Sequence, residues 1–220
     1  MPVPLWSGFV LMLRSTSQFL AAGVAICIAG PRWQQPRSLS LSCETFPTTA
    51  SLSALRTALG GAEISADSVP LGPTEGQMLP ATVFFPRDPA RRIVVVWKDT
   101  VAQVRPRFVY LAGGRTEWRT ADGITIGTSL HELERLNHQA FRLAGFAFDA
   151  AGAVVSWNGG RLATPLGSRC QRRVYVDSIS ATGLRSAAFR ALRGDAEFSS
   201  TNRDMQKLNP RVSTILLEYP

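Results

Sequence analysis

The sequence predicts an α+β protein made of two tandem helix–β-hairpin units, with short helices on an antiparallel sheet and a C-terminal strand segment. Two observations lead to this class. At about residues 48–99, a predicted helix with an N-cap and leucines along one face precedes a pair of apolar strands. The same order returns at about residues 123–160. With 220 residues and 45% apolar content, the chain has a size that buries roughly 70% of its unfolded surface. We therefore expect one domain over residues 43–220, after a signal peptide at 1–30 and a linker at 31–42.

The first thirty residues carry two apolar runs, Leu5–Leu13 and Phe19–Gly30, separated by Arg14. Neither run reaches the ~20 residues that a helix needs to span a bilayer. A basic residue ahead of the second run and small residues at its end are typical of a signal peptide, with Met12 as an alternative start. We expect a periplasmic or secreted protein that contacts the membrane only through this segment. An uncleaved anchor or a buried first helix is the alternative.

The cysteines predict a disulfide in the exported protein. If Cys27 leaves with the signal peptide, Cys43 and Cys170 remain as an even pair for an oxidising compartment. Their bridge would close a loop for which the chain-entropy model gives about 4–5 kcal/mol. Two buried free thiols, which behave as small apolar side chains, are the alternative.

The first unit begins with a helix over Ser51–Leu59, because a good N-cap precedes leucines on one helical face and two glycines follow. The next residues, Ile64–Pro80, contain several glycines and prolines and predict a long irregular excursion. Two runs rich in β-branched and aromatic residues, Ala81–Phe85 and Ile93–Trp97, then predict a hairpin around a proline-containing turn.

The second unit begins with a helix over Ser129–Asn137. Ser129 and Glu132 have the spacing of a capping box, in which each side chain satisfies an orphan amide of the first turn. The period then changes, and Phe141–Phe148 and Ala153–Trp157 predict a second hairpin with an irregularity at Gly145.

The two units indicate a tandem repeat, which would let two small sheets join or stack over one apolar face. Trp97 and Trp157 take equivalent positions at strand ends in the two units. A packing role in the core or at its rim explains both of them, and we expect the same role for Trp118.

Further elements lie outside the two units. Arg107–Leu111 and Val174–Val176 predict strands, and Leu184–Leu192 predicts an alanine-rich helix. The last strand is expected over Val212–Tyr219, where apolar and polar residues alternate.

Several motifs together resemble a family of exported bacterial proteins without an assigned function. They are TVFFPRDPARRIVVVW, GITIGTSLHELERLN, GFAFD, VVSWNGG and LNPRVSTILLEYP, and they cover most of the chain from Cys43 onward. The helix start G-I-x-I-G-x-S-x-x-E-L is also similar to that of small outer-membrane assembly lipoproteins, which share tandem helix–hairpin units with the β-lactamase-inhibitor proteins. These resemblances imply a fold and an export route; they bring no catalytic residues and no cofactor.

The charge of the chain comes from arginine. A formal net charge of +8 arises from 24 basic residues, of which only Lys98 and Lys207 are lysines, against 16 acidic ones. A coding bias toward arginine explains this, since the arginines are spread along the chain; an anionic partner is the alternative. The candidate binding residues lie beside aromatic residues: Arg105, Arg107, Arg169, Arg172 and Arg173. For an exported protein they favour an anionic envelope component, and we expect no nucleic acid.

A weak metal candidate consists of His131, Glu134 and His138, whose i, i+3 and i+7 spacing can share one helix face. The predicted end of the helix near Asn137 would remove His138 from that face, and no H-E-x-x-H motif is present. Solvated polar residues on a helix are therefore the favoured interpretation, and we expect no metal.

Catalytic groups are few. A Ser156–His131–Asp149 triad lacks the G-x-S-x-G elbow, and two histidines in the whole chain leave few acid–base groups near neutral pH. We expect a non-enzymatic binding or envelope-associated module whose partner is a protein or an anionic envelope component, with no cofactor. The alternative is an envelope hydrolase, zinc-dependent or not, around His131, Glu134 and His138.

Overall fold

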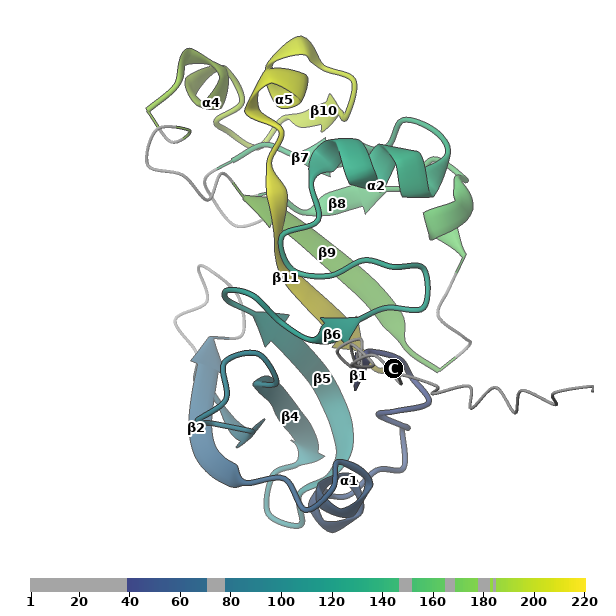
Figure 1. The fold of residues 1–220 in the computed structure, drawn as a ribbon, viewed down its shortest axis with the longest axis vertical. Coiled ribbons are helices and arrows are strands. Elements are labelled where there is room, and N and C mark those ends of the chain that lie inside the picture. Colours follow the sequence, from purple (N-terminus) through teal and green to yellow (C-terminus); the bar gives the residue numbers. More distant parts are fainter. Residues whose placement is uncertain (1–38, 71–77, 147–151, 165–168, 178–182, 184) are drawn as a thin grey trace, which may run out of the picture. The chain divides into compact units, whose positions relative to one another are not determined.

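The computed structural model describes residues 39–70, 78–146, 152–164, 169–177, 183 and 185–220 (Figure 1). In these ranges short helices accompany mostly antiparallel strands, so the predicted α+β class is confirmed. No helix within them is long and apolar enough to cross a membrane. The signal peptide predicted at 1–30 lies outside the described residues, as does most of the linker predicted at 31–42.

Six strands form the larger sheet in the order β2-β3-β4-β5-β11-β9, and every neighbouring pair is antiparallel. Their bounds are Ile64–Pro70 (β2), Met78–Phe84 (β3), Ile93–Asp99 (β4), Val104–Ala112 (β5), Gln171–Asp177 (β9) and Arg211–Glu218 (β11). The first predicted hairpin is β3–β4, and the separate strand predictions correspond to β5, β9 and β11. The last strand of the chain thus lies inside the sheet, between β5 and β9.

Strand β2 shows that the irregular excursion predicted for Ile64–Pro80 is wrong for residues 64–70 and 78–80, which form paired strands; residues 71–77 lie outside the described part of the chain. It pairs with β3 over seven positions, from Ile64 opposite Phe84 to Pro70 opposite Met78. The side chains from Ser65 to Ser68 are exposed, because β2 is the outer strand of this sheet. Such a strand lacks the apolar alternation from which strands are predicted, and its polar surface resists pairing with other chains.

The smaller sheet has the order β10-β7-β8, with Glu197–Ser199 (β10), Arg142–Ala144 (β7) and Val154–Ser156 (β8). Its hairpin β7–β8 confirms the second predicted hairpin, whose residues 147–151 lie outside the described part of the chain. Strand β7 ends at Ala144, next to the irregularity expected at Gly145, whereas the register shift of the hairpin lies between Arg142 and Leu143; the amide of Gly145 donates to Ala196 O. A Cβ at Gly145 would lie 2.5 Å from Gly194 O, so the close approach of these two backbones requires glycine.

Four short α-helices and one 3-10 turn complete the described elements. They are α1 (Leu52–Ala58), α2 (Leu130–Asn137), α4 (Ala187–Ala191), α5 (Arg203–Leu208) and η1 (Arg161–Ala163). The predicted caps are confirmed: Ser51 accepts from Ala54 N, and Ser129 forms the complete capping box with Glu132. The helix predicted at Leu184–Leu192 begins later, since Ser186 is its N-cap. Helix α5 was not predicted.

The segment before the predicted domain start also belongs to the fold. Leu39–Ser40 (β1) pairs in parallel with Trp118–Arg119 (β6), and Leu41 is fully buried. The last residues of the predicted linker are therefore structured. Directly after them, the predicted Cys43–Cys170 disulfide is present, with a Cα–Cα distance of 6.0 Å across 127 positions of sequence. It ties the start of the described chain to β9.

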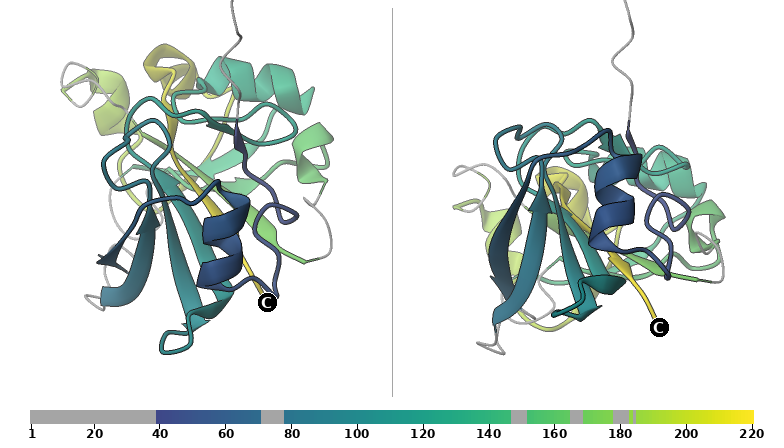
Figure 2. Two further views of the ribbon diagram at one scale, coloured as in Figure 1. Left: turned by 60° about the horizontal axis from the view of Figure 1, so that its bottom comes forward. Right: turned by 90° about the horizontal axis from the view of Figure 1, so that it is seen from below.

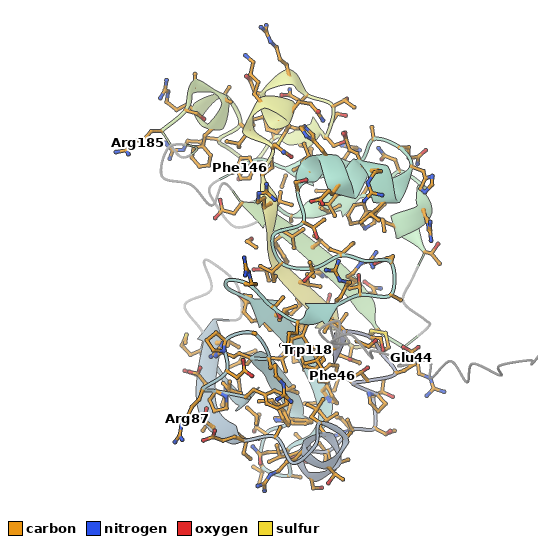
Figure 3. The ribbon with its side chains drawn as sticks, viewed as in Figure 1. Glu44, Phe46, Arg87, Trp118, Phe146 and Arg185 are labelled. Carbon is orange, nitrogen blue, oxygen red and sulfur yellow. A yellow bond between two sulfur atoms is a disulfide. The ribbon has the colours of Figure 1, made fainter. Side chains whose placement is uncertain are left out.

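The main core lies between the sheets and the helices. Helix α1 lies across one face of the larger sheet and buries Leu55 there (Figure 2). Phe46 and Trp118 meet inside the domain with ring centroids 5.6 Å apart (Figure 3). Trp97 and Trp118 are buried, and the half-buried Trp157 packs on Phe141, so the packing role predicted for all three tryptophans is confirmed.

The two helix–hairpin units occupy different surroundings. After α1 the chain forms β2 before the hairpin of the larger sheet, whereas α2 leads directly to β7 and the smaller sheet (Figure 1). The order helix then hairpin is thus present in both halves. The tandem repeat itself stays a prediction.

Candidate functional site

The arginines predicted to bind do not form one surface. Arg105 and Arg107 are exposed on β5, and Arg169 is exposed before β9. Successive side chains of a strand point to opposite faces, so Arg107 and Tyr110 lie on opposite faces of β5. Arg173 on β9 is aligned with Tyr110 across β11, and it therefore lies on the face opposite to Arg107. The guanidinium of Arg107 lies 5.1 Å from the ring centroid of Phe108.

Arg172 and Arg173 are neighbours on β9 and point to opposite faces. The side chain of Arg173 is 54% exposed and donates from Nε to Glu218 Oε2 over 2.6 Å. The side chain of Arg172 is only 3% exposed; it pairs with Asp122 and donates from Nη2 to Leu162 O over 3.0 Å. Arg172 is therefore a core residue, and its assignment to a binding surface is corrected.

The weak metal candidate is also dispersed. His131 and His138 are exposed, and His138 is the left-handed C-cap of α2 with φ of 63°. Glu134 accepts hydrogen bonds from Ser200 Oγ at 2.5 Å and from Gln206 Nε2 at 3.0 Å. Within the described ranges, no three His, Cys, Asp or Glu side chains gather where they could hold a metal ion. Glu134 instead joins α2 to α5.

The triad candidate is not assembled either. Ser156 Oγ accepts a hydrogen bond from Asn158 N at 3.0 Å, and Asp149 lies outside the described residues. His131 lies on the exposed side of α2. Within the part of the chain that the structure describes, no base is placed on the Ser156 hydroxyl.

Among the described residues, a hollow of about 430 Å³ lies where the loop before α2, helix α2 itself and the start of β11 meet. It is lined by basic, acidic and apolar side chains, chiefly Arg119, Arg135, Arg211, Glu132, Ile126 and Leu136. Three arginines against one glutamate leave a surplus of positive charge. Such a surplus favours the binding of an anion.

Backbone carbonyls hold two of these arginines in place. Arg119 donates from Nη1 to Gly123 O, and Arg211 donates from Nη1 to Gly127 O, each over 2.9 Å. Both glycines have positive φ, 92° and 88°, a conformation that glycine adopts without strain. Each guanidinium thus uses one N–H to fix its position and keeps others for a ligand.

The loop that carries these carbonyls is fastened to β11. Gly127 N donates to Val212 O, and Leu130 N donates to Pro210 O, each over 2.8 Å. Ser129 also forms a β-bridge with Arg211. These bonds place the first residue of β11 beside the N-terminus of α2, although the two are far apart in sequence.

Glu132 is the one acidic residue of the hollow. Its Oε2 accepts from Ser129 N at 2.8 Å and from Ser129 Oγ at 2.9 Å. These backbone and side-chain hydrogen bonds, and then the charges of Arg211 and Arg135, lower the pKa of Glu132. The carboxylate is therefore charged near neutral pH and is fixed by the capping box.

Asp122 and the buried Arg172 stabilise the same loop through an ion pair. Asp122 Oδ2 pairs with Arg172, and Asp122 Oδ1 accepts from Thr120 Oγ1 at 2.5 Å. Thr120 also closes the turn, because its carbonyl accepts from Gly123 N. Arg172 thus stabilises the turn that positions Gly123 O, the acceptor of Arg119.

No protein-family model, no curated protein and no solved structure matches this chain. The site therefore rests on the residues of the chain itself. Sequence reasoning found the capping box with Glu132 but missed the hollow, because Arg119, Arg135 and Arg211 come from three separate elements. No local spacing marks them as a set.

Proposed function

We propose that this protein is an exported, non-enzymatic module that binds an anionic component of the cell envelope in the hollow formed by Arg119, Arg135 and Arg211. The surplus positive charge of that hollow is the observation that carries the proposal. Arginine suits this role, since its planar fork matches carboxylate and phosphate groups and it stays protonated at any physiological pH.

The compartment follows from two features. Disulfides such as Cys43–Cys170 persist in oxidising environments outside the cytoplasm. The apolar run with a preceding basic residue at the N-terminus has the proportions of a signal peptide. We therefore place the protein in the periplasm or outside the cell, within the family of exported bacterial proteins that its motifs resemble. Mass spectrometry of the native protein should find an N-terminus near residue 31, and an intact Met1 or Met12 would contradict cleavage.

Binding is favoured over catalysis by the residues of the hollow. Arginine cannot exchange protons near neutral pH, and the lowered pKa of Glu132 keeps its carboxylate ionised there, so that it has no proton to donate. The hydrolase alternative has no comparable support, because Glu134 is bound to Ser200 and Gln206.

A titration with inorganic phosphate as a simple anion probe tests the proposal. Arg135 makes no side-chain hydrogen bond within the described residues, so Arg135→Gln should leave the fold intact while removing one charge from the hollow. We expect it to weaken phosphate binding about tenfold, as for the loss of a charged hydrogen-bond donor. Arg105→Gln makes the same charge change on β5, away from the hollow, and serves as the matched control. Equal effects of the two substitutions would refute the proposal.

Salt gives a second readout. Binding to exposed arginines should weaken as sodium chloride is raised toward 1 M, where the screening length falls to about 3 Å. Affinity that is unchanged over this range would contradict a charge-based site.

A further inference from the structure

The position of Glu132 in a cationic hollow carries a second inference, which rests on the proposed function. Both hydrogen bonds that the Glu132 carboxylate accepts from Ser129, one from its N–H and one from its hydroxyl, end on Oε2. Within the described part of the chain, Oε1 accepts no hydrogen bond, and no arginine forms a salt bridge with this carboxylate. Glu132 therefore brings a charged acceptor to the hollow that the protein itself leaves unused.

A carboxylate at this place selects against simple anions. It repels sulfate or a bare carboxylate, neither of which carries a hydrogen-bond donor near neutral pH, and a charged carboxylate can itself only accept hydrogen bonds. A ligand gains from Glu132 only if it also carries donors, such as hydroxyl groups, next to its own negative charge. A ligand that matches the hollow therefore carries an anionic group for the arginines and a hydrogen-bond donor for Glu132.

The remaining lining extends this match. Thr125 and Thr128 also line the hollow, with their hydroxyls engaged by Trp118 O and Thr125 N, and Ile126 and Leu136 bring half-buried apolar surface. A pyranose ring presents both features, because its hydroxyls surround a face of C–H groups. The hollow's volume of about 430 Å³ lies within the usual range of small-ligand sites, about 300–1,000 Å³.

We infer that the hollow recognises a hydroxylated carboxylate, namely a uronic-acid unit of an acidic saccharide. Its carboxylate lies against the guanidinium groups of Arg119, Arg135 and Arg211. One ring hydroxyl donates to Glu132 Oε1, and the C–H face of the ring packs on Ile126 and Leu136.

The substitution Glu132→Gln should change the affinity for a uronate and the affinity for a simple anion in opposite directions. Glutamine at the third helical position still completes a capping box, so the helix start is retained. The probes are glucuronate, sulfate, which carries no donor, and uncharged glucose, with affinities measured by calorimetry or NMR titration. For sulfate, loss of the like charge should raise affinity about two- to threefold. For glucuronate, loss of the charged acceptor should lower affinity about fivefold, since bonds to charged groups are the stronger ones.

Each outcome decides one question. Opposite effects of Glu132→Gln on the two anions, with glucose bound at least tenfold more weakly than glucuronate, would establish the inference. If the substitution strengthens the binding of both anions, or if sulfate binds the wild-type protein as tightly as glucuronate, the uronate inference is wrong while the anion site stands. If Arg135→Gln changes neither affinity, the proposed function itself fails. Thermal melting of each variant checks that the fold is intact.

Discussion

Replacement of Asp122 by alanine should destabilise the protein far more than the loss of an ordinary surface ion pair. The Arg172 side chain is 3% exposed and that of Asp122 is 18% exposed. Without Asp122, the guanidinium keeps the Leu162 carbonyl as its partner, while its Nε is already buried without a hydrogen bond. Because arginine cannot shed its charge, the charge would stay buried and uncompensated.

The size of the effect follows from this burial. Removal of one partner of a buried ion pair costs about 3–5 kcal/mol, and the partial exposure of Asp122 favours the lower end. Thr120 Oγ1 retains Ile124 O as an alternative acceptor, at 3.2 Å, so the loss of its bond to Asp122 adds little. A cost of about 3 kcal/mol corresponds to a decrease in Tm of about 6–12 °C for a domain of this size.

Urea unfolding of the oxidised protein measures the free-energy change. Glu218→Ala is the matched control, because it removes the partner of the exposed Arg173 and should cost at most about 1 kcal/mol. The double variant Asp122→Ala/Arg172→Met should recover much of the loss, since an apolar side chain tolerates the buried position. Equal costs for Asp122→Ala and Glu218→Ala, or no recovery in the double variant, would refute the reasoning.

Three further predictions concern the disulfide, a glycine and pH. Joint replacement of Cys43 and Cys170 by serine should lower the free energy of unfolding by about 4–5 kcal/mol, because the bridge spans 127 positions; urea unfolding with a loss below 1 kcal/mol would contradict it. Gly145→Ala should lower Tm by more than 5 °C, because its Cβ would lie 2.5 Å from the rigid Gly194 carbonyl; an unchanged melting curve would show that the backbones can separate. The pKa of Glu132 is lower in the folded protein, so its contribution to stability is present above the unfolded value of about 4.3 and is lost as pH falls through the folded value. Unfolding curves of wild type and Glu132→Gln should therefore converge below pH 4, and a gap that is constant from pH 7 to pH 3 would contradict this.

The starts of α1 and α2 and most strands of the larger sheet could be predicted from the sequence alone. Ser51 and Ser129 mark the first turns of α1 and α2, because a cap involves only residues within one helical turn. A continuous run of β-branched and aromatic residues located β4, which is buried on both faces, and alternation of apolar and polar residues located β11. The outer strand β2 has neither an apolar run nor apolar alternation, because Ser65–Ser68 are exposed, and it was therefore not predicted.

The candidate site, in contrast, was decided only by tertiary structure. Arg172 was indistinguishable from Arg173 in sequence, yet one is buried against Asp122 and the other is exposed beside Glu218. Their difference depends on which face of β9 is covered, and that follows from its pairing with β11. Arg119 and Arg211 become neighbours of one hollow through long-range bonds such as that between Gly127 N and Val212 O. Local rules act over about four residues, whereas a convergent site is set by pairing between strands and loops that are distant in the chain.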